Sequence, residues 1–237
     1  HRDLHSFPTR RSSDLPDNTA VEVEVISSDE VCFTVSLTSE VEKSLIMRVA
    51  NTPNEFNLIN KIKNTSKLTL RTASWGITTF APGGVGYMPI PKASSQSETL
   101  CASGQINLWD YTLLSDPAFA WRSEWVEFHQ NRTLSKQKVG TFLRNPWLAY
   151  RLKESLVIKT FDFNKEELSA SDFPDLGSNI EVYFDTSMLE LEGLSPWTEL
   201  KPGESVSHTE KLQVLAIEPD WSHEKVIELV KSSITQA

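Results

Sequence analysis

The sequence predicts an all-β protein, a sandwich or barrel of antiparallel strands, that ends in one short helix. Three observations support this fold class. Runs that alternate apolar and polar residues follow one another along the chain, turn residues separate these runs, and hardly any window before residue 221 has a helical period. The 237 residues, 39% of them apolar, suit one large all-β domain or two small ones, with enough apolar side chains for a core.

The predicted strands begin close to residue 21. Residues 21–25 alternate valine with glutamate, which is the period of a half-buried strand, and residues 31–37 repeat that period. Turn residues such as Pro82-Gly83-Gly84 and Pro202-Gly203 separate the later runs, and the polar, serine-rich stretch 91–104 is expected to be a long surface loop. Further strands are expected at residues 45–50, 56–62, 68–72, 76–80, 125–129, 156–163, 180–184, 188–191 and 205–217.

The C-terminal segment differs from the rest because its apolar residues have a helical period. Ser222 is suited to cap a helix, and Glu224 lies near the positive end of the helix dipole. The apolar stripe of this helix consists of Val226, Ile227, Val230 and Ile234. Since no internal repeat or linker is evident, we expect one sandwich domain at 16–220 and a helix at 221–237.

Residues 1–15, HRDLHSFPTRRSSDL, back-translate to the common adapter that is ligated to DNA for short-read sequencing. A chance match over fifteen consecutive codons is not credible, and a targeting peptide does not fit because there is no apolar core or small-residue cleavage site. We therefore expect this segment to be an artefact and the sandwich to be incomplete at its N-terminus. Exposed edges would then make the chain prone to aggregation, whereas a full-length version is expected to be monomeric. The sequence does not indicate the cellular compartment of the protein.

The net negative charge argues against two classes of binding partner. The chain has 32 acidic and 23 basic residues, a net charge of −9, which argues against nucleic acid and against an anionic membrane surface. No apolar run reaches the roughly 18 residues that a membrane-spanning helix needs. The two cysteines, Cys32 and Cys101, form neither a disulfide framework nor a metal cluster, and we expect no metal and no cofactor.

Tryptophan is unusually common, and several of the seven lie beside polar residues, as Trp109 does beside Asp110. An indole face packs well against the C–H face of a sugar ring, while neighbouring carboxylates and amides bind hydroxyl groups. The alternative is that these large rings fill the core of the sandwich. The composition is compatible with both interpretations.

Two carboxylates stand out in the run Met188-Leu189-Glu190-Leu191-Glu192. Strand alternation places Glu190 and Glu192 on one face, about 6.5–7 Å apart, where each opposes ionisation of the other. Such a pair can hold a general acid or base with a shifted pKa. The alternative is an acidic strand that faces solvent.

A series of motifs in residues 64–217 resembles an uncharacterised bacterial domain family of the galactose mutarotase-like, or aldose 1-epimerase-like, superfamily. The motifs are Asn64-Thr65-Ser66, Trp75-Gly76-Ile77-Thr78, Ala81-Pro82-Gly83-Gly84, Leu108-Trp109-Asp110-Tyr111, Lys138-Val139-Gly140, Trp147-Leu148-Ala149-Tyr150, Val157-Ile158-Lys159-Thr160-Phe161, Phe173-Pro174-Asp175-Leu176-Gly177-Ser178-Asn179-Ile180-Glu181, Leu189-Glu190-Leu191-Glu192-Gly193-Leu194-Ser195-Pro196 and Leu200-Lys201-Pro202-Gly203-Glu204-Ser205.

The resemblance implies a β-supersandwich with a sugar cleft on one sheet, and a mono- or oligosaccharide as partner. It places Glu192 as the catalytic base, ahead of the turn Pro202-Gly203-Glu204. Where relatives carry a histidine acid this chain has Trp75 and Thr78, and the family pattern does not point to His129. The substrate-binding candidates are Trp75, Trp109, Asp110, Lys138, Lys159, Glu181 and Glu190. The function is then an epimerase-type isomerase, a non-catalytic carbohydrate-binding domain, or an accessory domain of a polysaccharide hydrolase or lyase.

Overall fold

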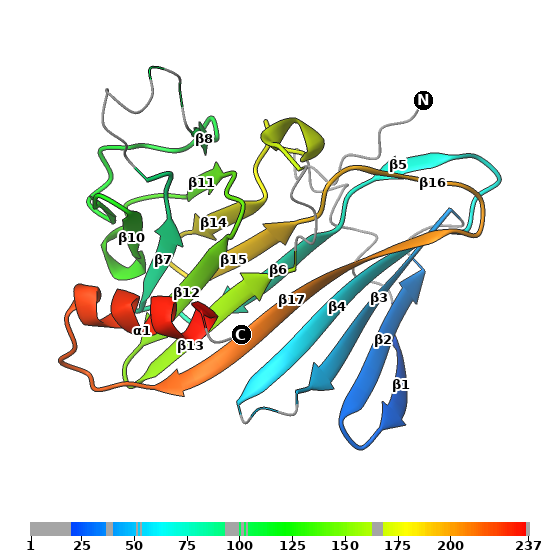
Figure 1. Cartoon of the computed structure of the whole chain (residues 1–237), viewed down its shortest axis with the longest axis horizontal. Helices are drawn as coiled ribbons and strands as arrows, with labels where there is room; N and C mark the ends of the chain where they lie inside the picture. Colours follow the sequence, from blue (N-terminus) through cyan, green and yellow to red (C-terminus); the bar gives the residue numbers. More distant parts are fainter. Residues whose placement is uncertain are drawn as a thin grey trace.

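The structure is a computed structural model that describes residues 20–36, 40–50, 52, 54–92, 100, 102, 104–162 and 168–235. The segment 1–15, interpreted above as adapter sequence, lies outside these residues, as does most of the expected loop at 91–104. Antiparallel strands make up most of the described chain and one α-helix follows them (Figure 1). The predicted fold class is therefore confirmed.

The larger sheet has ten strands, all paired antiparallel with their neighbours. Its strands, in spatial order, are β1 (Glu22–Ser27), β2 (Glu30–Ser36), β3 (Val41–Val49), β4 (Glu55–Asn64), β17 (Ser205–Ala216), β13 (Ser155–Phe161), β12 (Trp147–Leu152), β7 (Val85–Pro89), β10 (Trp125–His129) and β9 (Phe119–Trp121). The long strand β17 joins the N-terminal strands to the central ones.

The smaller sheet has five strands, and a two-stranded ribbon accompanies it. Its spatial order is β6 (Trp75–Phe80), β15 (Leu189–Leu194), β14 (Ile180–Phe184), β11 (Gln137–Thr141) and β8 (Ile106–Leu108). The ribbon pairs β16 (Thr198–Leu200) with β5 (Leu70–Thr72). Short 3-10 turns lie at Gln130–Arg132 and Ala170–Asp172.

The main core lies between the two sheets. Alternate residues of each strand point inward, so that aliphatic and aromatic side chains of both sheets interdigitate. The larger sheet contributes Met88, Val126, Phe128, Leu148 and Tyr150, and the smaller one contributes Val139, Ile180, Val182, Phe184, Leu189 and Leu191. This packing fixes which face of the smaller sheet is left outside.

The helix α1 (His223–Thr235) covers part of the opposite face of the larger sheet. The Lys225 amide donates to the Ser222 hydroxyl at 3.3 Å, which confirms the expected cap. Val226, Ile227 and Val230 are buried against that sheet, and Ile234 packs beside them. The predicted apolar stripe is thus confirmed. The helix is too short and too polar to cross a membrane, and no other α-helix occurs in the described part of the chain.

The sequence analysis did not predict six of the described strands. Most of these six lack the alternation of apolar and polar residues on which the prediction relied. β11 and most of β12 are buried on both faces, so their residues do not alternate between apolar and polar. β7 contains a glycine and ends at a proline. The strands β8, β9 and β16 have only three residues each, too few to show a period.

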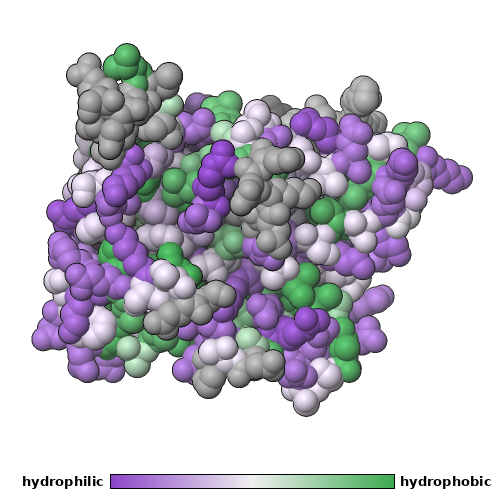
Figure 2. All heavy atoms as spheres, viewed as in Figure 1, coloured by the Kyte–Doolittle hydropathy of each residue, from purple (hydrophilic) through white to green (hydrophobic). Residues whose placement is uncertain are grey.

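One burial prediction was wrong. The alternation at residues 21–25 predicts a half-buried strand, but every residue of β1 is exposed, with Val23 at 61% and Val25 at 76%. β1 is exposed because it is an edge strand of the larger sheet and lies beyond the part that the smaller sheet covers (Figure 1). Figure 2 shows hydrophobic surface among the polar side chains where β1 to β4 lie.

Candidate functional site

The outer face of the smaller sheet carries the two carboxylates singled out in the sequence. Leu189 and Leu191 of β15 are in the core, so Glu190 and Glu192 point to the opposite side of the sheet. The expected common face of the two glutamates is therefore confirmed. What the sequence could not supply is the set of side chains that neighbouring strands bring to them.

Cross-strand pairing places a third carboxylate beside the pair. In the register of β14 with β15, Glu181 lies opposite Glu192, and Tyr183 lies opposite Glu190. On the next strand Gly140 is paired with Glu181, and a Cβ at Gly140 would lie 2.5 Å from Ser178 Oγ and 3.1 Å from Glu181 Cγ. The glycine of Lys138-Val139-Gly140 thus makes room for the side chains of Ser178 and Glu181.

Lys138 of β11 holds the two buried carboxylates together. Its Nζ lies 2.7 Å from Glu181 Oε2 and 2.7 Å from Glu192 Oε2. The indole N–H of Trp75 also donates to Glu192 Oε2, at 2.5 Å. Glu181 and Glu192 are both fully buried, and Lys138 is 5% exposed. Two carboxylates therefore share one ammonium group in an environment that excludes water.

Two aromatic rings flank this ammonium. Lys138 Nζ lies 4.8 Å from the ring centroid of Trp75 and 4.8 Å from that of Trp109, the distance of a cation–π contact. Both tryptophans are half-buried, and Tyr111 nearby is 41% exposed. Burial raises the pKa of Tyr111 to about 12, so its hydroxyl stays protonated at neutral pH. The rings separate the buried charges from solvent.

Burial and neighbouring charges shift the pKa values of Glu181 and Lys138. Burial, together with the charge of Glu192, raises the pKa of Glu181 well above 4.5, although Lys138 opposes this. Burial lowers the pKa of Lys138, but its two carboxylate partners outweigh that effect and the pKa is raised. One ammonium therefore faces two buried carboxyl groups, and the raised pKa favours the protonated form of Glu181.

Glu190 and Asp110 lie at the margin of the site. Glu190 is half-buried, accepts a hydrogen bond from the Thr79 hydroxyl at 3.2 Å, and has a pKa raised by burial and by Glu192. Asp110 is exposed in a turn that the Thr112 amide closes by donating to the Trp109 carbonyl at 2.8 Å. In the described part of the chain the Lys138 ammonium pairs with Glu181 and Glu192, and not with Glu190 or Asp110.

Lys159 is not part of this site, although the sequence analysis proposed both Lys138 and Lys159 as substrate-binding residues. It lies on β13 of the larger sheet, and its ammonium donates to Thr78 Oγ1 at 3.1 Å and to the Leu191 carbonyl at 2.9 Å from the inner side. Its ion-pair partner is Glu210, at 3.0 Å. Burial lowers the pKa of Lys159 and raises that of Glu210. The smaller sheet therefore separates Lys159 from the outer face.

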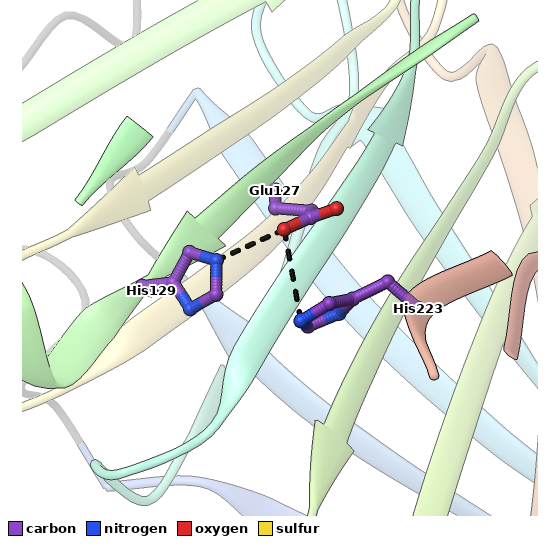
Figure 3. A group of neighbouring side chains, drawn as sticks. All are labelled: Glu127, His129 and His223. Carbon is purple, nitrogen blue, oxygen red and sulfur yellow. Dashed lines mark hydrogen bonds and ion pairs between the residues drawn. The ribbon is translucent and has the colours of Figure 1, made fainter. Parts of the chain in front are cut away.

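A second cluster was missed by the sequence analysis. Glu127, His129 and His223 meet on the face of the larger sheet that α1 covers (Figure 3). The alternation of Glu127 and His129 along β10 was a local signal that they share a face. Nothing local connects them to His223, because the contact forms only when α1 folds back on the sheet.

No family model and no curated protein matches the sequence. Solved structures do match in fold. A candidate aldose 1-epimerase from Escherichia coli K12 is 12% identical, with a TM-score of 0.51 over 84% of this chain and 69% of that one. A galactose mutarotase related enzyme from Lactobacillus acidophilus is 11% identical, with a TM-score of 0.50 over 86% of this chain and 74% of that one.

The same fold occurs within a larger protein. A TPR-domain containing protein from Parabacteroides distasonis ATCC 8503 is 11% identical, with a TM-score of 0.50 over 82% of this chain but only 34% of that one. At these identities the similarity shows the fold. The chain has the galactose mutarotase-like sandwich fold, as the sequence resemblance implied.

Proposed function

We propose that the protein binds a sugar on the outer face of the smaller sheet and interconverts its anomers, as an isomerase of the aldose 1-epimerase type. The observation that carries this proposal is the arrangement of Glu181, Lys138 and Glu192 beneath the rings of Trp75 and Trp109. Two bacterial proteins of similar fold, a candidate aldose 1-epimerase and a mutarotase related enzyme, support the substrate class.

Mutarotation requires a base that takes the proton of the anomeric hydroxyl and an acid that protonates the ring oxygen. Glu192 is suited to be the base, because the Lys138 ammonium and the Trp75 N–H hold its Oε2 in place at 2.7 Å and 2.5 Å. Glu181 is suited to be the acid, because its raised pKa keeps a proton on it. Two neighbouring carboxyl groups in different protonation states are the arrangement that such acid–base chemistry needs.

The aromatic rings provide a platform for the sugar. Trp75 and Trp109 offer faces that suit the C–H surface of a pyranose, and Asp110 and Glu190 at the margin can accept hydrogen bonds from its hydroxyl groups. Glu181 and Glu192 are fully buried, so the substrate reaches them only if a ring moves. Trp109 is suited to move, because it begins the turn Trp109–Thr112, which contains the exposed Tyr111 and is followed by the exposed Leu113 and Leu114.

A second candidate is a non-catalytic carbohydrate-binding domain that uses the same platform. The burial of both carboxylates favours it, because a binding surface needs only the half-buried rings and the marginal polar groups. The occurrence of this fold as about a third of a TPR-domain containing protein is compatible with such an accessory role. Lys159 has no part in either version, since it lies on the inner side of the sheet.

The test is the rate of anomer interconversion, measured by exchange NMR on a panel of reducing aldoses. We expect wild-type protein to accelerate exchange for at least one sugar and Glu192→Gln to abolish the acceleration. Glu199→Gln, an exposed change on β16, is the matched control and should leave the rate unchanged. A normal thermal melt shows that Glu192→Gln is folded.

Trp109→Ala separates the two candidates. Saturable sugar binding that Trp109→Ala weakens, without any accelerated exchange by the wild type, would establish the binding domain and remove the isomerase. Accelerated exchange that survives Glu192→Gln would remove Glu192 from the base role. Neither binding nor exchange across the panel would reject the site as a whole.

A further inference from the structure

The cluster of Glu127, His129 and His223 lies on the other side of the molecule from the proposed sugar site. Glu127 and His129 are two residues apart on β10 and project from the face opposite to the core residues Val126 and Phe128. His223 is the first residue of α1. Figure 3 shows both imidazole rings directed at the Glu127 carboxylate.

The three side chains have the spacing of ligands around one small cation. His129 Nε2 lies 3.0 Å from Glu127 Oε2, His223 Nε2 lies 3.7 Å from the same oxygen, and all three ligand atoms lie within 4.8 Å of one another. Tetrahedral zinc with bonds of about 2.0–2.1 Å separates its ligand atoms by about 3.4 Å. Small side-chain rotations would therefore place a cation among them.

Neighbouring polar side chains orient His223 and Glu127. The His223 Nδ1 lies 2.8 Å from the Tyr87 hydroxyl, which leaves Nε2 as the atom that faces the cluster. The other carboxylate oxygen of Glu127 accepts hydrogen bonds from Arg122 Nε at 2.8 Å and from Trp125 Nε1 at 3.2 Å, and Arg122 Nη2 donates to Oε2 itself at 3.3 Å. Protein metal sites show this support, in which outer partners fix the orientation of each ligand.

An open cavity leads to the two histidines. It has a volume of about 410 Å³, and His129 and His223 are among the residues that line it. A cation therefore has an entry path, and its fourth position would face this cavity. Arg132, Arg151 and Lys153 also line it, so an anion or a hydroxide is the kind of fourth ligand that fits there. The same positive charges weaken cation binding.

We propose that Glu127, His129 and His223 form a binding site for a divalent transition-metal ion of the zinc class, with three protein ligands and one position open to the cavity. Two imidazoles and one carboxylate favour zinc, nickel or cobalt over magnesium or calcium, which prefer oxygen ligands. Three protein ligands with an open position are the set found in catalytic rather than purely structural zinc sites.

The experiment is isothermal titration of the full chain with ZnCl₂ at pH 7.5, repeated with CoCl₂ and followed by visible absorption. We expect one zinc per chain and a cobalt spectrum of low coordination number. His223→Ala and Glu127→Gln should each weaken zinc binding more than about 100-fold, since outer-shell changes alone cost about 10–100-fold. Tyr87→Phe, which removes only a positioning contact, should cost about tenfold.

Two further variants serve as controls. Glu228→Gln changes an exposed carboxylate farther along α1 and should leave zinc affinity unchanged. Arg132→Gln removes a positive charge from the cavity and should tighten binding severalfold. All variants keep His1 and His5, so differences among them report on the cluster. Equal zinc affinity in wild type and in a folded His223→Ala, or no binding tighter than millimolar, would overturn the proposal.

Discussion

Glu181 and Glu192 lie opposite each other on adjacent strands of the smaller sheet and share the ammonium of Lys138, which is 2.7 Å from an oxygen of each. This relationship decides both the stability and the proposed chemistry of the outer face. Two buried carboxyl groups beside one cation oppose each other's ionisation, and the first two predictions below follow from this arrangement.

Removing Lys138 should destabilise the fold strongly. We expect Lys138→Met to lower the free energy of unfolding by about 3–5 kcal/mol, because it leaves buried carboxyl groups without their cation. Urea unfolding monitored by tryptophan fluorescence measures this loss. Lys136→Met, an exposed lysine next to the same strand, is the matched control and should change stability by less than about 0.5 kcal/mol. A loss in Lys138→Met as small as the control's would show that the ion pairs do not hold the site together.

The stability of the protein should depend on the titration of Glu181. Its pKa is raised in the folded state, so the protonated form is favoured by folding. The resulting contribution to stability is fully present below the ordinary pKa of 4.5 and is lost as pH rises through the higher folded value. We expect Glu181→Gln, which is neutral at every pH, to gain stability relative to wild type as pH increases from 5 to about 9.

Thermal melts of wild type and Glu181→Gln over that range check this. The comparison between the two proteins cancels the other titrating groups, including His208, whose pKa is lowered to about 4 by burial and acts in the opposite direction. Glu204→Gln, an exposed change before β17, should show no such trend. If the difference between Glu181→Gln and wild type stays constant with pH, the proton is not on Glu181.

The exposed edge strand β1 should promote self-association. Val23 and Val25 lie on one face of it, Val25 is 76% exposed, and among the described residues the strand pairs only with β2. We expect Val25→Lys to reduce self-association at high protein concentration, as measured by size-exclusion chromatography with light scattering, while the melting temperature changes little. Val25→Ile keeps the apolar face and should associate like wild type. A wild-type protein that stays monomeric at the highest concentration would contradict the expectation.

Much of the fold followed from local patterns. Alternation predicted most of the longer strands, and the apolar stripe after Ser222 predicted α1 with its cap. Prediction was poorest where alternation is absent, as in β11, which is buried on both faces, and in strands of three residues. It was also wrong about the burial of β1, because alternation tells which residues share a face but not whether anything covers that face.

The sequence by itself determined that Glu190 and Glu192 share one face of a strand and that Leu189 and Leu191 share the other, because successive side chains of a strand point to opposite sides. Only the tertiary structure decided that Lys138 joins Glu192 while Lys159 joins Glu210, and that His223 meets Glu127 and His129. These contacts depend on which strands become neighbours and how the helix packs back. Such choices are made by long-range packing, and no local period encodes them.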